Sequence, residues 1–216
     1  MSSIEIIDRT ADYVKTALSA EGSGHDWWHV SRVWKMARRI GEAERADLLV
    51  VELAALLHDI ADWKSCGGDC TVGPEMAKKW LDSLGIDPSV IQHVCQIIAD
   101  ISFKGAGVEQ PVLSLEGQVV QDADRLDAMG AIGVARAFAY GGAKGRLIYD
   151  PERKPTEHRT AESYLQSGGT TINHFYEKLL LLKDRMNTAT GKAMAEKRQQ
   201  FMEDFLRRFY EEWEGG

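Results

Sequence analysis

Cysteine is scarce in this chain of 216 residues, which contains only Cys66, Cys70 and Cys95. An odd and small number of cysteines cannot build a disulfide framework and is typical of a reducing compartment. Cys66 and Cys70 lie in the glycine-rich segment CGGDC, and no second Cys or His pair follows at the spacing of a zinc ribbon. We therefore expect free thiols instead of a structural zinc site, and a cytoplasmic location.

The sequence also lacks an excess of basic residues and any long apolar run. It has 26 Lys and Arg against 33 Asp and Glu, a net charge of -7, whereas binding to nucleic-acid polymers or anionic membranes requires a basic surface. The longest strongly apolar stretch, residues 48–60, is interrupted by Glu52 and by the pair His58-Asp59, so it cannot span a bilayer. We expect neither a polymer nor a membrane as partner. A few placed cations would still suffice to bind a small anionic substrate.

Helical periodicity runs along nearly the whole chain. Hydrophobic residues make up 44% and charged residues 27% of the sequence, as in ordinary globular proteins, and no alternating pattern is long enough to build a sheet. We predict an all-α fold with a helical core over residues 1–142 and a loop and helical subdomain over 143–216 that packs on it as one globular unit. The predicted helices include residues 27–45, 47–62, 88–101, 115–140, 170–186 and 188–213.

The pair His58-Asp59 is the strongest chemical signal in the sequence. It lies near the end of the predicted helix 47–62, whose centre LAALL is apolar almost all round and should be buried. Relative to His58, Asp59 would lie about 100° and Asp62 about 40° around the helix axis, so the three would share one face. Charged residues are rarely buried unless they are paired or bind a metal. An imidazole and two carboxylates on a buried face predict a divalent-cation site.

Two further polar residues fall on apolar helix stripes. His29 lies one turn inside a helix that Asp26 would cap, on the stripe that faces the core. Asp124 shares a stripe with apolar and small residues, and a buried carboxylate needs a partner. Each also has an ordinary explanation: a core histidine bonded to the backbone, or a surface network in which Asp124 or Asp127 pairs with Arg125.

The segment HDWWH, residues 25–29, suggests a competing interpretation, because it resembles the H-E-x-x-H motif of zinc proteases with Asp in place of Glu. That motif requires both histidines on one helix. Here glycines precede His25 and Asp26 has the character of a helix cap, so His25 is expected before the helix. We expect His25 at the rim of a pocket or behind the ligands, and not as a protease ligand.

Together, His29, the pair His58-Asp59 and Asp124 resemble the H…HD…D signature of the HD-domain superfamily of metal-dependent phosphohydrolases. An HD dipeptide alone is weak evidence, whereas four elements in order and in matching helices are strong. The resemblance extends from about Ser23 to Trp213 and implies an HD-domain helical bundle with a C-terminal helical extension. Four segments are similar to the bacterial subfamily that includes nucleoside triphosphate pyrophosphohydrolases: GHDWWHVSRV, ELAALLHDIADWK, DADRLDAMGAIGVARAF and HFYEKLLLLKDRMNT.

The resemblance implies that His29, His58, Asp59 and Asp124 bind one divalent metal. Two imidazoles and two carboxylates suit Mn, Fe, Co, Ni or Mg better than a closed structural zinc site. Members with two metals carry further histidines between the HD pair and the last Asp, and this chain has only His93 there. A single metal is therefore expected, with His93 as an ordinary residue of a helix face.

Related phosphohydrolases carry an acid at the position of Asp62 that orients or deprotonates the attacking water; the alternative is a surface carboxylate at the helix end. Asp127, like His25, would support the ligands from behind. Because phosphate groups require cations, we name as substrate-binding candidates Lys64, Lys104, Arg125, Lys144 and Arg146, with Lys178 and Arg198 as further possibilities. Any one of these cations is more often solvated or salt-bridged than bound to a ligand.

The expected function is hydrolysis of a phosphoester or phosphoanhydride bond in a nucleotide. Cleavage of a nucleoside triphosphate to monophosphate and pyrophosphate comes first, through the resemblance alone. A 5'-nucleotidase-type phosphatase of monophosphates and a regulatory module that binds a nucleotide or metal without turnover both stay open. A helical interaction protein with a structural metal would instead unfold on chelation. A homodimer is compatible with the sequence.

Overall fold

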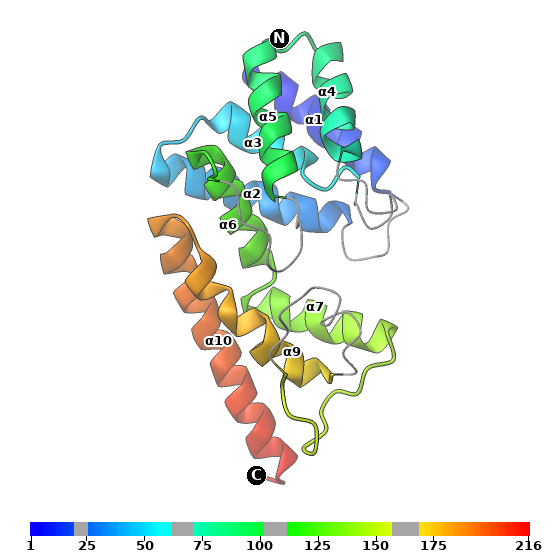
Figure 1. The fold of residues 1–216 in the computed structure, drawn as a ribbon, viewed down its shortest axis with the longest axis vertical. Helices are drawn as coiled ribbons and strands as arrows, with labels where there is room; N and C mark the ends of the chain where they lie inside the picture. Colours follow the sequence, from blue (N-terminus) through cyan, green and yellow to red (C-terminus); the bar gives the residue numbers. More distant parts are fainter. Residues whose placement is uncertain (20–25, 62–70, 102–111, 157–168) are drawn as a thin grey trace. The chain divides into compact units, whose positions relative to one another are not determined.

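The computed structural model describes residues 1–19, 26–61, 71–101, 112–156 and 169–216 (Figure 1). These residues form helices, turns and loops with no strand among them, which confirms the predicted all-α class. Two compact units are present: Met1–Phe103 with Glu109–Ala123, and Lys104–Val108 with Asp124–Gly216. The domain limits that the sequence suggested, at residues 142 and 143, stay a prediction. None of the described helices combines the length and apolar character needed to cross a membrane.

The first unit is built around α3 (Leu48–Leu57). Three helices pack against it: α1 (Ser3–Ala17), α2 (Trp27–Glu44) and α5 (Pro88–Ile101). A further helix, α4 (Val72–Ser83), packs on α5. The segment from Leu53 to Leu57 is inaccessible to solvent along its whole length. This confirms the prediction that the LAALL helix is central and buried, and it places the residues that follow it at the edge of the core.

Side-chain caps define where the central helices begin. The carboxylate of Asp26 accepts a hydrogen bond of 2.9 Å from the backbone N–H of His29, so α2 begins at Trp27 as predicted. The carboxylate of Asp47 does the same for α3, accepting from the N–H of Leu49 at 2.9 Å. Each cap satisfies an N–H group that a helix start would otherwise leave unbonded.

The end of α3 differs from the prediction. The helix does not continue to residue 62: it ends at Leu57, and His58 is its C-terminal cap residue. The N–H of Ile60 bonds to the carbonyl of Leu57 at 3.2 Å, an i to i+3 contact that tightens the chain into a turn. His58 and Asp59 therefore lie in a turn and not in a continuing helix, whereas Asp62 lies outside the described residues.

The prediction of one long helix over residues 115–140 was also wrong, because this part of the chain forms two helices. Helix α6 spans Leu115–Asp127 and α7 spans Gly130–Ala143. Met129 is extended, with φ −119° and ψ 164°, and Gly130 has φ +67°. An L side chain rarely adopts that positive φ, so glycine permits the sharp turn. The stripe that Asp124 was predicted to share with apolar and small residues therefore cannot continue beyond Asp127 on one helix face.

The second unit contains α7, α9 (Thr171–Glu177) and α10 (Ala189–Trp213), with α7 packed against both of the others. The predicted helix 170–186 is correct only in its first part. After α9 the chain forms two short 3₁₀ turns, η1 (Leu179–Leu181) and η2 (Lys183–Arg185). The start of α10 is as predicted, with the Thr188 hydroxyl accepting from the N–H of Gly191 at 2.9 Å.

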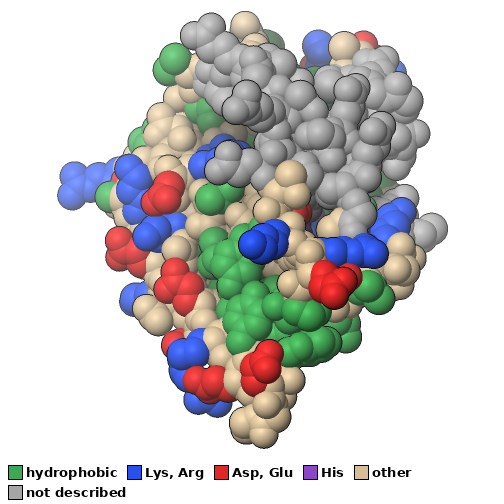
Figure 2. All heavy atoms as spheres, turned by 60° about the horizontal axis from the view of Figure 1, so that its bottom comes forward, with side chains coloured by type: hydrophobic (Ala, Val, Ile, Leu, Met, Phe, Trp, Pro, Cys, Tyr) green, Lys and Arg blue, Asp and Glu red, His purple; other side chains and the backbone are tan. Residues whose placement is uncertain are grey.

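Aromatic side chains gather near the end of α10. The ring of Tyr149 lies 5.8 Å from Phe209, 5.4 Å from Tyr210 and 5.0 Å from Trp213, all in edge-to-face geometry. Such arrangements bring the positive ring edge of one residue to the negative face of another. Figure 2 shows hydrophobic side chains gathered on the surface, with Lys, Arg, Asp and Glu side chains around them. The aromatic cluster fixes the loop that follows α7 to α10.

Candidate metal centre

The first component of the candidate site is His29, near the start of α2. Asp26 fixes the first turn of this helix through the His29 N–H, and so fixes the backbone that carries the imidazole. The His29 side chain is 2% exposed. A polar ring this deeply buried requires polar neighbours.

His58 is oriented by its own helix. Its Nδ1 lies 2.8 Å from the carbonyl oxygen of Ala55, one turn earlier. Since a carbonyl can only accept, Nδ1 carries a proton and donates, which leaves Nε2 as the nitrogen available to a metal. Histidines that bind metals are commonly held in this way, with one nitrogen on a carbonyl and the other on the metal.

Asp59 brings the two imidazoles together. Its Oδ2 lies 3.3 Å from His29 Nε2 and 3.4 Å from His58 Nε2. The two rings meet edge to face, with centroids 5.5 Å apart. One ligand atom from each of the three residues lies within 4.8 Å of the others. The turn after α3 thus places His58 and Asp59 beside His29, whereas the sequence prediction had placed His58 and Asp59 on one face of a continuous helix.

The geometry of these three residues fits a divalent metal. Ligands about 2.1 Å from a metal, in tetrahedral or octahedral arrangement, lie roughly 3.0–3.4 Å from one another. The measured 3.3 and 3.4 Å fall in that range. The Asp59 side chain is 19% exposed while both histidines are nearly inaccessible. The cluster therefore has a closed side of imidazoles and a side that solvent or a substrate can reach.

Four of the predicted site residues lie outside the described residues: His25, Asp62, Lys64 and Lys104. Their roles stay predictions. Asp124, the predicted fourth ligand, is partly buried and is the first residue of α6 that belongs to the second unit. Its role as a ligand stays a prediction as well.

Asp127, predicted to support the ligands, is engaged in an ion pair. Its Oδ2 lies 2.5 Å from Arg136 Nη1, and its side chain is only 1% exposed. Arg198 donates to the carbonyl of Leu126; burial lowers the pKa of the Arg198 guanidinium, and the Asp127 carboxylate opposes that shift. Arg125, a predicted substrate-binding residue, donates to the carbonyl of Arg185.

Arg136 was missed by sequence reasoning. The sequence placed residues 127 and 136 on one predicted helix, nine positions apart, where they would not meet. The turn at Gly130 brings α7 back toward the end of α6, so that the two side chains pair. Gly130 and Gly133, in a stretch otherwise rich in alanine, were a signal that could have suggested this turn.

Lys144 and Arg146, the remaining predicted substrate-binding residues, follow the end of α7. The Lys144 Nζ lies 5.8 Å and the Arg146 Cζ 5.5 Å from the centre of the Tyr140 ring. At these distances the ring face attracts both cations. The structure thus brings these two cations to one aromatic ring within the second unit.

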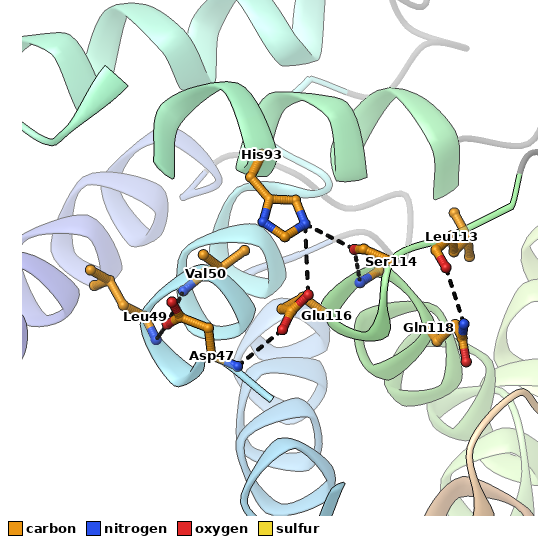
Figure 3. Close-up of polar contacts among 9 residues, drawn as sticks. Asp47, Leu49, Val50, His93, Leu113, Ser114, Glu116 and Gln118 are labelled. Atoms are coloured by element: carbon orange, nitrogen blue, oxygen red, sulfur yellow. Dashed lines mark hydrogen bonds and ion pairs between the residues drawn. The ribbon is translucent and has the colours of Figure 1, made fainter. Parts of the chain in front are cut away.

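His93 is not among the residues that group with His29 and His58; Figure 3 shows it beside Ser114 and Glu116. Its Nε2 lies 2.9 Å from the Ser114 hydroxyl and 3.7 Å from Oε2 of Glu116. The other oxygen of Glu116 accepts from the N–H of Asp47 at 3.1 Å, at the start of α3. His58 follows the opposite end of that helix. His93 therefore belongs to a polar network that connects α5, α6 and the start of α3.

The comparisons with known proteins show the family to which the chain is similar. Residues 27–129 match the family model of the HD domain, a range that includes His29, His58, Asp59 and Asp124. The chain is also 41% identical over 210 residues to the Bacillus subtilis protein YpgQ, covering 96% of this chain and 93% of that protein. This chain belongs to the HD domain family.

Solved structures extend the similarity to the whole chain. An HD-superfamily hydrolase from Bacillus thuringiensis is 43% identical, with a TM-score of 0.81 and complete coverage of both chains. The crystal structure of Bacillus subtilis YpgQ in complex with ADP has a TM-score of 0.78 and 36% identity, covering 98% of this chain and 97% of that one. These comparisons establish the predicted HD-domain helical fold.

Proposed function

We propose that this protein is a metal-dependent phosphohydrolase that acts on a nucleotide, and that it cleaves a nucleoside triphosphate to the monophosphate and pyrophosphate. The observation that carries the proposal is the convergence of His29 Nε2, His58 Nε2 and Asp59 Oδ2 at metal-ligand spacing. A nucleotide as substrate is supported by the relative YpgQ, whose crystal structure contains ADP.

Each residue has a distinct part in this proposal. His29, His58, Asp59 and Asp124 hold one divalent cation, which can be Mn, Fe, Co, Ni or Mg on ligand chemistry. When bound, such a metal polarises a phosphoryl oxygen and lowers the pKa of a water molecule. The hydrogen bond from His58 Nδ1 to Ala55 fixes the orientation of the ring, so that Nε2 is the nitrogen aimed at the cluster.

The remaining predicted residues act on water and on the phosphates. Asp62 accepts the proton of the attacking water, as a positioned carboxylate can. Cationic side chains bind the phosphate oxygens through charge-assisted hydrogen bonds, and the candidates are Lys64, Lys104, Arg125, Lys144 and Arg146. Asp127 and His25 support the ligands, Asp127 through the buried ion pair that fixes the end of α6 to Arg136.

A substrate panel tests the function directly. The protein is incubated with nucleoside mono-, di- and triphosphates in the presence of Mn²⁺, Co²⁺ or Mg²⁺, and products are separated by ion-exchange chromatography. We expect pyrophosphate and a monophosphate from triphosphates. His58→Gln should abolish turnover, whereas His93→Gln, which changes a histidine of the Glu116 network, should retain it.

Other outcomes would redefine the function. Release of orthophosphate from monophosphates alone would identify a 5'-nucleotidase-type phosphatase. Binding of a nucleotide with no product under any metal would identify a regulatory module. Both results contradict the proposed pyrophosphohydrolase.

A further inference from the structure

Each residue that follows Asp124 in the last turn of α6 is tied to a different element of the second unit. The ties are a donation from Arg125 to the carbonyl of Arg185 in η2, a donation from Arg198 of α10 to the carbonyl of Leu126, and the ion pair of Asp127 with Arg136 of α7. Helix ends ordinarily fray, because their last carbonyls lack partners within the helix. Three elements therefore hold the turn that begins at Asp124.

Arg198 closes the C-terminal end of α6. The Leu126 carbonyl accepts from two donors, the backbone N–H of Met129 at 3.0 Å and the guanidinium of Arg198. A cation at this end of a helix also complements the partial negative charge of the helix dipole. The stem of Arg198 packs on the bend that follows, since a Cβ at Gly130 would lie 3.1 Å from its Cγ. Arg198 thus contacts both the last turn of α6 and the bend into α7.

The inward position of Arg198 follows from the packing of α10 along α7 (Figure 1). Ala195 and Met202, about one turn before and after Arg198, are inaccessible to solvent, so they share with it the helix face that lies against the rest of the unit. A guanidinium on such a face needs acceptors inside the protein, and the Leu126 carbonyl is one of them. The sequence suggested Arg198 as a possible phosphate-binding cation, whereas this contact indicates a different role.

Asp124 lies three positions before Asp127, on the same side of α6, and is the proposed fourth ligand of the metal. A ligand that is already ordered binds a metal more tightly, because less conformational freedom is lost on binding. We propose that Arg198 is a positioning residue for Asp124: it fixes the carbonyl of Leu126, and through it the helical turn from which the Asp124 carboxylate extends. This inference rests on the proposed function, because it takes Asp124 as a ligand.

A purely structural role for Arg198 leads to a different expectation. Loss of a contact that only joins α10 to α6 would lower the free energy of unfolding and leave the metal affinity of the folded protein unchanged. A positioning role lowers that affinity, and does so only while the Asp124 carboxylate is present. Metal affinity and stability therefore have to be measured separately.

Mn²⁺ titration of the full chain, with free Mn²⁺ measured by electron paramagnetic resonance, tests the proposal. We expect Arg198→Gln to weaken Mn²⁺ binding about tenfold, as loss of a group that orients a ligand commonly does. Arg198→Lys keeps a charged donor and should weaken it less. Arg207→Gln is the matched control, because Arg207 belongs to the same helix and pairs with Glu211 at 3.0 Å on the exposed surface. It should bind Mn²⁺ as the wild type does.

A double-mutant cycle with Asp124→Asn identifies the route of the effect. Once the carboxylate has been replaced, Arg198→Gln should have little further effect on Mn²⁺ affinity. Circular dichroism and urea unfolding in EDTA measure the fold and the stability of each variant. If Arg198→Gln does not fold, Arg198→Met, which keeps the apolar stem against Gly130, takes its place in the cycle.

The outcomes separate this inference from the proposed function. Unchanged Mn²⁺ affinity in the folded Arg198 variant, or an equal loss with and without the Asp124 carboxylate, would overturn the positioning role and leave the metal centre in place. Absence of Mn²⁺ binding to the wild type would overturn the metal centre itself, and wild-type affinity in Asp124→Asn would remove its fourth ligand. Either result would end the positioning role as well.

Discussion

The two ring nitrogens of His58 have different environments, and this difference makes the residue suitable as a ligand. Nδ1 is bonded to the Ala55 carbonyl, while Nε2 faces Asp59 at 3.4 Å. We expect His58→Gln and Asp59→Asn each to lower the metal content of the purified protein to less than a tenth of one equivalent, because each removes a ligand from a small set. Elemental analysis after dialysis measures this.

His93→Gln is the matched control for this experiment, because it changes a histidine that contacts Ser114 and Glu116. It should keep the wild-type metal content. Normal metal content in folded His58→Gln would remove His58 from the coordination set, and with it the proposed centre.

Asp62 and Asp124 are predicted to have different roles, and amide substitution separates them. Asp62→Asn should keep the metal and lower kcat by roughly 10²–10⁴-fold, because an amide cannot accept the proton of water. Asp124→Asn should lower the metal content, because an anionic ligand is lost. Metal stoichiometry and single-turnover rates at saturating substrate measure both effects. Wild-type kcat in Asp62→Asn would make Asp62 a surface carboxylate, and loss of metal would make it a ligand.

The pKa of the His174 imidazole on α9, which burial lowers to about 3, makes stability depend on pH. The folded protein binds this proton only near pH 3, whereas the unfolded chain binds it below about pH 6.5. The unfolded state therefore holds more protons between these values, and the free energy of unfolding falls as the pH falls through 6.5, by up to about 1.4 kcal/mol per pH unit. Urea unfolding of His174→Gln from pH 7 to 5 should show a shallower decline than the wild type. Parallel profiles would contradict the depressed pKa.

The residues of the metal cluster were predictable for a reason that does not depend on where the helix ends. Polar residues at the end of an apolar, buried helix must meet other polar groups. His29 and the pair His58-Asp59 do so, although the helix ends before His58. The Arg136 partner of Asp127 was not predictable, because the pairing depends on a turn whose backbone geometry leaves no periodic signal.

At the scale of elements, Gly130 determines where α6 and α7 separate. Its φ is +67°, and a Cβ there would lie 3.1 Å from Cγ of Arg198. Gly130→Ala should therefore destabilise the protein by about 1–2 kcal/mol, from backbone strain alone. Gly142→Ala is the matched control within the same helix, since its Cβ would have no neighbour within 4 Å. It should stabilise by roughly 0.5–1 kcal/mol. Chemical denaturation measures both, and effects of the same sign would contradict this account.

The starts of helices were more predictable than their ends. Asp26, Asp47 and Thr188 each accept a backbone N–H at a helix start, and short polar side chains of this kind are visible in a sequence. The ends of α3 and α9 carry no such signal. Both pass into tight i to i+3 turns, at Leu57 and at Leu179–Leu181, and neither end is followed by a glycine or proline that would mark it in the sequence. Tertiary packing decides such endings.

At the scale of the whole molecule, the apolar core does not depend on the candidate metal. The buried segment from Leu53 to Leu57 is covered by helices α1, α2 and α5 through apolar contacts, and burial of such side chains stabilises the fold in the absence of any ligand. A structural metal, by contrast, would be required for folding. The fold therefore favours a metal that is added to a preformed site.

Thermal unfolding with and without metal tests this distinction. A metal that binds only the folded state, at a hundred times its Kd, raises the free energy of unfolding by about 2.7 kcal/mol, which is roughly 5–10 °C in Tm for a chain of this size. We expect EDTA to leave the helical circular dichroism signal at 20 °C unchanged and to remove this increase in Tm. His58→Gln should show no increase with Mn²⁺, because the binding site is lost, while His93→Gln should show the full increase. Loss of helical signal on chelation would instead identify a structural metal, and an equal increase in His58→Gln would place the stabilising metal outside the cluster of His29, His58 and Asp59.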